Sequence, residues 1–275
     1  MNSPDNISTE PADGAGLHGD LDQLLSAVRE AGALTMSFFG QSPRSKLKAD
    51  GTSVSEADLA ADALLKERLL DANSAYGWLS EESEDDLSRL KKSRVWIVDP
   101  IDGTRAFLKG KPEWTICAAL VEDGQTLLAA VYNPATEEFF HAVHGGGAFL
   151  NDTRITVREP VDLEGCCLAA SASQLHSKQW MIPWPELETL WVNSIAYRLA
   201  LVAAGKCDGT VSLSGKSDWD IAAAHLLVHE AGGIVTTHDA SPLVYNLENP
   251  RHSSVVSAGP ALHKELIART SRATL

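Results

Sequence analysis

Apolar side chains recur every three or four residues in two stretches near the start of the chain. In the first stretch they are Leu21, Leu24, Leu25, Val28, Ala31, Leu34 and Phe38. This spacing predicts an amphipathic helix over 21–39 that ends near Gly40. The second stretch, over 55–70, opens with Ser55 and an acid, Asp58, three residues later, which is typical of a helix capping box. We therefore predict two helices, joined by a polar and basic loop over 45–53.

The middle of the chain changes to short apolar runs separated by turn residues. Runs over 95–98, 114–121, 127–132 and 138–143 predict strands, because Gly, Pro, Asn and Asp lie between them. We interpret the glycine run 145–147 as a turn between two subdomains. Beyond it, strands over 209–213, 234–237 and 254–258 alternate with helices over 194–204, over 219–230 and from 262. This order predicts layered α and β structure, of the α+β or α/β class.

The same pattern suggests a division of the chain into a leader and two subdomains. Residues 1–19 are polar and rich in Asp, Ser, Pro and Gly, so we expect a mobile leader there. We expect an α+β subdomain over 20–146 that carries most metal ligands. An α/β subdomain over 147–275 would complete the active site.

The net charge and the cysteines indicate which partners the protein avoids and in which compartment it works. The chain has 275 residues and a formal charge of −14, which argues against a nucleic-acid polymer or an anionic membrane as its partner. An anionic substrate would then need metal ions at its site. The cysteines, Cys117, Cys166, Cys167 and Cys207, show no metal-type spacing, so we interpret them as reduced thiols of a cytoplasmic protein.

Two carboxylates follow one of the predicted strands within a short distance. The apolar run 95–98 leads into Asp99-Pro100-Ile101-Asp102-Gly103-Thr104. Asp99 and Asp102 would repel each other and raise one another's pKa, and a divalent cation removes that conflict. Hard oxygen ligands suit Mg²⁺ or Mn²⁺. Gly103 and Thr104 can then open a helix whose free N–H groups accept a phosphate.

Three further acids have ordinary interpretations when each is taken alone. Glu81 lies in an acidic run, and Asp58 and Asp220 lie at predicted helix starts, where the helix dipole favours acids. Because they occur together with Asp99 and Asp102, in this order, we favour a shared functional site for all five acids.

The combined blocks resemble the inositol monophosphatase superfamily. They are Lys48-Ala49-Asp50-Gly51-Thr52-Ser53-Val54-Ser55-Glu56-Ala57-Asp58, Ser80-Glu81-Glu82, Asp99-Pro100-Ile101-Asp102-Gly103-Thr104, Trp219-Asp220-Ile221-Ala222-Ala223-Ala224 and Glu230-Ala231-Gly232-Gly233. They span most of the chain. The resemblance implies a five-layered αβαβα sandwich and Mg²⁺-dependent, Li⁺-sensitive hydrolysis of phosphomonoesters, with two to three ions and Mn²⁺ as a substitute.

The resemblance also implies a role for each residue of the site. Metal ligands would be Glu81, Asp99, the carbonyl of Ile101, Asp102 and Asp220, with Asp99 bridging two ions and a third, weaker ion on Glu81. Asp58, Thr104 and Glu81 would be catalytic, because Thr104 paired with Asp58 positions the attacking water. Gly103 and Thr104 would hold the phosphate, and we place Arg105, Ser194 and Lys216 among the further substrate contacts. Two ions that flank an in-line displacement agree with this arrangement.

The substrate is the finer question. Segments 78–82, 102–107 and 110–114 look most like the CysQ-type 3′(2′),5′-bisphosphate nucleotidases, which hydrolyse adenosine 3′,5′-bisphosphate. Inositol monophosphatases place an acid before the Trp-Asp block to bind ring hydroxyls, whereas residues 209–217 contain none, and Lys216 is the one charge there. The nucleotidase is therefore our main prediction for a small phosphorylated metabolite as substrate.

Two departures from the nucleotidase pattern keep other readings open. Ser171-Ala172-Ser173-Gln174 stands where those enzymes often carry Ser-Arg-Ser-His, and Asn193-Ser194 replaces a common Gly-Ser. The alternatives are an inositol-1-monophosphatase, a histidinol phosphatase, and a regulatory binding protein on the same scaffold. A homodimer is also left open.

Overall fold

The helices and strands of the computed structural model follow the alternation of apolar runs and turns along the chain. The structure describes residues 14–48, 51–71, 73–159, 162–175, 180 and 182–273. Its helices are α1 (Gly14–Met36), α2 (Glu56–Asp71), α3 (Thr104–Leu108), α4 (Ala172–Leu175), α5 (Ile195–Ala203), α6 (Asp218–Glu230) and α7 (Pro260–Thr270), with a 3-10 turn η1 (Ser88–Lys91). No helix in the described ranges is long and apolar enough to cross a membrane.

Two sheets and two short strand pairs make up the β structure of the described residues. The larger sheet has the order β3 (Gly77–Ser80), β4 (Arg94–Asp102), β5 (Thr115–Glu122), β6 (Gln125–Asn133), β7 (Glu138–Val143), β8 (Gly147–Leu150) and β9 (Thr153–Arg154). The smaller sheet has the order β11 (Glu188–Thr189), β10 (Cys167–Leu168), β12 (Gly209–Ser212), β16 (Val255–Ala258) and β14 (Ile234–Thr236). The pairs are β1 (Ser45–Leu47) with β2 (Ser53–Ser55), and β13 (Lys216–Ser217) with β15 (Arg251–His252).

Buried side chains alternate between the two faces of the larger sheet. On β4, Val95 and Ile97 pack into one core with α5 and α6, whereas Trp96 and Val98 pack into another with α1 and α2. Successive strand residues point to opposite faces, so an unbroken apolar run is the sequence mark of a sheet covered on both sides. A third core joins the smaller sheet to α7.

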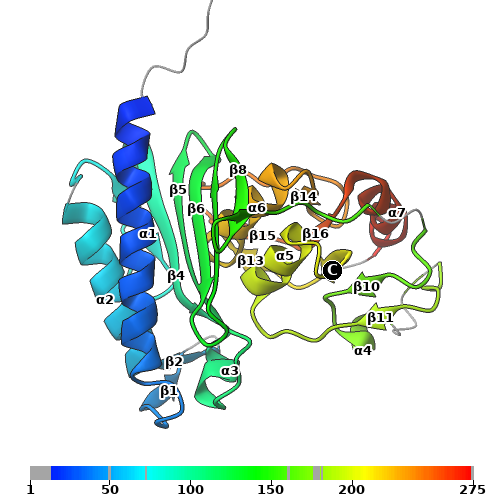
Figure 1. Ribbon diagram of the computed structural model, residues 1–275, viewed down its shortest axis with the longest axis horizontal. Coiled ribbons are helices and arrows are strands. Elements are labelled where there is room, and N and C mark those ends of the chain that lie inside the picture. Colours follow the sequence, from blue (N-terminus) through cyan, green and yellow to red (C-terminus); the bar gives the residue numbers. More distant parts are fainter. Residues whose placement is uncertain are drawn as a thin grey trace, which may run out of the picture.

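The elements therefore stack in five layers, which confirms the predicted αβαβα sandwich. Figure 1 shows α1 and α2 on the outer face of the larger sheet, and α5 and α6 between the two sheets. The helix α7 covers the far side of the smaller sheet. Helix and strand faces that need an apolar partner thus find one on each side.

The structure differs from the sequence expectations at three places. The first helix begins at Gly14, inside the predicted leader, and residues 1–13 lie outside the described residues. The segment predicted as a loop over 45–53 pairs as an antiparallel hairpin, with Ser45 opposite Ser55. The glycine turn joins β7 to β8 within one sheet, so a boundary at residue 146 cuts through that sheet, which continues to Arg154. The division into two subdomains stays a prediction.

Candidate active site

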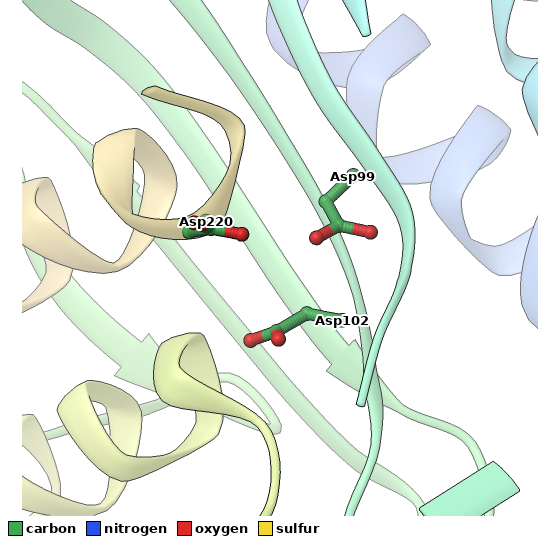
Figure 2. A group of neighbouring side chains, drawn as sticks. All are labelled: Asp99, Asp102 and Asp220. Carbon is green, nitrogen blue, oxygen red and sulfur yellow. The ribbon is translucent and has the colours of Figure 1, made fainter. Parts of the chain in front are cut away.

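The strand β4 carries both central aspartates, and an irregularity in its pairing brings them together. Asp99 lies opposite Cys117 and Asp102 lies opposite Thr115, with a register shift between them. On a regular strand, residues three apart point to opposite faces. An extra residue in one strand turns the next side chain, so both carboxylates reach the same site. Figure 2 shows them converging with Asp220.

Asp220 arrives from the first turn of α6, on the other side of the site. Its carboxylate accepts a hydrogen bond from the Ser217 N–H at 2.7 Å, as part of a capping box. Carboxylate oxygens of Asp99, Asp102 and Asp220 lie within 4.8 Å of one another. All three acids are metal ligands in the sequence prediction, and the structure brings them together.

Burial and mutual repulsion strain this cluster. Asp99 is 1% exposed and Asp102 is 8% exposed. Burial raises the pKa of Asp99 well above its usual value, and the nearby charges of Glu81, Asp102 and Asp220 add to the effect. Burial also raises the pKa of Asp102 to about 6 and that of Asp220 to about 7. A cluster of hard oxygen donors with these raised pKa values fits a divalent cation, which would relieve both penalties.

Backbone and side-chain donors fix the orientation of the aspartates. Asp102 Oδ2 accepts hydrogen bonds from the Ser194 hydroxyl and the Ala196 N–H, both at 2.7 Å. Asp99 accepts one from the Ile101 N–H at 3.0 Å. Ser194 also caps α5 by accepting from the Tyr197 N–H. Ser194, predicted as a substrate contact, is fully buried and does not line the cavity, because its hydroxyl is turned toward Asp102.

Glu81 lies just after β3 and lines the same cavity. It stands outside the group of three aspartates whose oxygens lie within 4.8 Å of one another. Its Oε1 atom lies 2.9 Å from Lys48 Nζ, and the same ammonium lies 2.7 Å from Glu82. The lysine from the β1–β2 hairpin thus forms an ion pair with a carboxylate that the resemblance assigns to a metal ion.

Thr104 and Asp58 form the predicted pair. Thr104 Oγ1 lies 3.1 Å from Asp58 Oδ1 and 3.0 Å from the carbonyl oxygen of Ile101. Asp58 Oδ2 accepts hydrogen bonds from the N–H and the hydroxyl of Ser55, a partner that the capping-box pattern at Ser55 had signalled. Both oxygens of Asp58 are therefore held, and Thr104 is fixed beside β4.

Gly103 occupies a position that other residues fit poorly. Its φ is 101°, and a Cβ there would lie 2.8 Å from the Glu113 carbonyl oxygen. Only glycine adopts this conformation without strain. The turn from β4 into α3 therefore depends on it, and Thr104 follows as the first residue of α3.

A cavity of about 390 Å³ connects these groups to the smaller sheet. Cations also line it: the predicted contacts Arg105 and Lys216, and Arg198, which sequence reasoning did not name. Trp191 was missed as well. A signal for Arg198 existed, because it is the one charged residue in the otherwise apolar helix over 195–203.

Comparison with known proteins places the chain in a family. The model of the inositol monophosphatase family matches residues 20–275. An inositol-1-monophosphatase of Rhizobium meliloti (strain 1021) is 37% identical over 227 residues, which cover 78% of this chain and 83% of that protein. The Nus factor SuhB of Escherichia coli (strain K12) is 32% identical, over 80% of this chain and 85% of that protein.

Solved structures agree with the sequence comparisons. The Thermotoga maritima IMPase superposes with a TM-score of 0.79 at 29% identity, covering 91% of this chain and 96% of that one. Several relatives carry the name inositol-1-monophosphatase and the relatives named above carry no nucleotidase name, so the alternative of an inositol monophosphatase is better supported than the predicted nucleotidase. The chain therefore belongs to the inositol monophosphatase family, and it is a phosphatase, a hydrolase that acts on phosphomonoesters.

Proposed function

We propose that this chain hydrolyses a small phosphorylated metabolite by Mg²⁺-dependent attack of water. The observation that carries the proposal is the convergence of Asp99, Asp102 and Asp220 within 4.8 Å. Two divalent ions held there would activate the water and neutralise the leaving oxygen. Phosphoryl transfer asks little covalent help from a protein, so positioning and charge are what the residues must supply.

The remaining residues of the site have positioning roles in this proposal. Asp58 holds the hydroxyl of Thr104, which is then oriented toward the site of the attacking water. Gly103 lets the backbone turn tightly at the end of β4, so that the backbone N–H groups of Gly103 and Thr104 meet the phosphate. Ser194 keeps Asp102 aimed at the other two aspartates.

For the substrate, inositol 1-phosphate is the first candidate. Relatives that cover most of this chain carry the name inositol-1-monophosphatase. A cavity of about 390 Å³ is large enough for a single phosphorylated ring.

A second candidate, adenosine 3′,5′-bisphosphate, is favoured by one observation. The segment 209–217 has no acid to accept ring hydroxyls, and its Lys216 lines the cavity. Burial lowers the pKa of Lys216, and its ammonium donates to the carbonyl and hydroxyl of Ser214. A phosphate group is a stronger partner for such a cation than a ring hydroxyl.

A phosphate-release assay tests both the metal requirement and the choice of substrate. The substrates are inositol 1-phosphate, adenosine 3′,5′-bisphosphate, histidinol phosphate and fructose 1,6-bisphosphate, each with Mg²⁺ and with excess EDTA. Turnover with Mg²⁺ and its loss with EDTA are expected. Full turnover in EDTA would overturn the metal mechanism. No turnover of any substrate would favour a regulatory binding protein, although none of the metal acids is missing.

A further inference from the structure

Arg198 is a buried cation in the wall of the active-site cavity, and no carboxylate in the described part of the chain forms an ion pair with it. It lies on α5 and is 8% exposed. Its Nε–H donates to the Val192 carbonyl oxygen at 2.6 Å. Among the described residues, no other hydrogen bond involves its guanidinium, and no carboxylate lies within 4.0 Å of it. The terminal nitrogens are not sealed in, because they keep contact with the solvent of the cavity.

Trp191 covers one face of this guanidinium. The Arg198 Cζ atom lies 4.6 Å from the centre of the Trp191 ring, within the range of a cation–π contact. The indole is 59% exposed and also lines the cavity. The contact and the bond to Val192 fix the plane of the guanidinium, while four N–H donors stay free for a ligand.

The charged groups near Arg198 favour an anionic ligand beside it. Of the carboxylates in the described residues, Asp102 exerts the main attraction on Arg198, without forming an ion pair with it. Divalent ions at the three aspartates would cancel that field and leave Arg198 buried with no counter-charge. Lys216 is attracted by Asp220 and Asp102 and repelled by Arg198, so ions on these aspartates would offset its counter-charges as well. Leaving buried cations unpaired is costly in free energy, and an anionic ligand would remove that cost.

We propose that Arg198 determines specificity by binding a second anionic group of the substrate, with Lys216 as its neighbour. The substrate class is then a phosphate monoester that carries another phosphate or a carboxylate, whatever its ring. The proposal rests on the phosphatase activity proposed above, and it applies to inositol phosphates and nucleotides alike. The absence of an acid in 209–217 agrees with it, because an acid there would repel such a group.

Matched substrate pairs separate the second anion from the ring. The pairs are inositol 1-phosphate with inositol 1,4-bisphosphate, adenosine 3′-monophosphate with adenosine 3′,5′-bisphosphate, and glycerol 3-phosphate with 3-phosphoglycerate. The proteins are the natural chain, Arg198→Gln, Arg198→Lys, and Arg68→Gln as a control that removes an exposed guanidinium of α2. Melting temperatures show whether each variant folds.

We expect Arg198→Gln to lower kcat/KM about tenfold to a hundredfold on the doubly anionic member of a pair, mainly through KM. The singly anionic member should change by less than about threefold, and Arg198→Lys should recover part of the loss because it keeps the charge. A loss in the bisphosphate pairs identifies a phosphate as the second group, and a loss in the glycerol pair identifies a carboxylate. Arg68→Gln should leave both members unchanged.

Equal losses on both members of every pair would overturn the proposal, because Arg198 would then act on the cleaved phosphate or on the fold. No loss on any substrate would overturn it as well. Calorimetric binding of adenosine 3′,5′-bisphosphate and inositol 1,4-bisphosphate to the natural chain and to Arg198→Gln gives a readout without turnover. Binding that depends on Arg198 in a protein without phosphatase activity would support this inference while contradicting the proposed function.

Discussion

At the scale of single residues, the centre of the site is an electrostatic conflict. Asp99, Asp102 and Asp220 are crowded, and each has a raised pKa. Asp99→Asn should lower activity by about a hundredfold or more, because the resemblance makes Asp99 the ligand that two ions share. Steady-state phosphate release measures this, with Glu265→Gln on the exposed face of α7 as the matched loss of a carboxylate. Activity within a few-fold of the natural chain would exclude Asp99 as a shared ligand.

The same conflict predicts how stability depends on pH without metal. The pKa of Asp220 rises from its usual 3.8 to about 7 in the folded state, mainly through burial. Between these values the folded state binds more protons than the unfolded state, so this group's contribution to stability is lost as pH rises toward about 7. Asp220→Asn should therefore preserve or raise the melting temperature in EDTA, and its advantage over the natural chain should grow between about pH 5 and pH 7.5.

Thermal unfolding in EDTA across this pH range checks the prediction. The difference between variant and natural chain is the quantity to follow, because titrating groups far from Asp220 contribute equally to both. Loss of the Asp220 charge also eases the repulsion on Asp99 and Asp102, which acts in the same direction. A variant that melts far below the natural chain at every pH would show that Asp220 has a structural role.

At the scale of elements, the β1–β2 hairpin supplies a cation to the proposed metal site. Lys48 binds Glu81 and Glu82, and this pairing raises the pKa of Lys48 to about 12, against the effect of burial. An ammonium on Glu81 competes with a metal ion for the same carboxylate. Lys48→Ala should lower the Mg²⁺ concentration for half-maximal activity about two- to fivefold, a range typical of a partly exposed ion pair.

A magnesium titration of activity gives the measurement, with Lys46→Ala as the control. Lys46 lies on the same hairpin and is exposed, so its loss changes the net charge without changing the contact to Glu81. An equal shift in both variants would point to a general charge effect.

At the scale of the whole molecule, the aspartates join two layers of the sandwich. Asp99 and Asp102 belong to the larger sheet, and Asp220 belongs to α6 in the layer between the sheets (Figures 1 and 2). A cation bound between them stabilises the folded state by mass action, about 2.7 kcal/mol at a hundred times its dissociation constant. The melting temperature should rise with Mg²⁺, by roughly 5–10 °C for a chain of this size.

Calorimetric or fluorescence melting in EDTA and in Mg²⁺ tests this coupling. Asp220→Asn should lose most of the rise, because it removes the ligand that α6 contributes. A rise of the same size in that variant would place the stabilising ion elsewhere.

The sequence by itself determined the main helices and strands and the residues of chemical interest, whereas the five-layered arrangement was what the family resemblance implied. An apolar run such as 95–98 predicts a buried strand, and helical spacing such as that over 21–39 predicts an amphipathic helix, because side-chain periodicity is a local property. The acids Asp58, Glu81, Asp99, Asp102 and Asp220 were named from their order along the chain. The comparisons confirmed the family that this order resembles.

The tertiary structure decided how these residues meet. A pairing irregularity in β4 puts Asp99 and Asp102 on one side, and the packing of α6 brings Asp220 to them. Ser194 proved to orient Asp102 at the start of α5, and Arg198 lies one helical turn beyond it, in the cavity beside Trp191. Local periodicity could not reveal these contacts, because distances between residues remote in sequence are set by packing between layers.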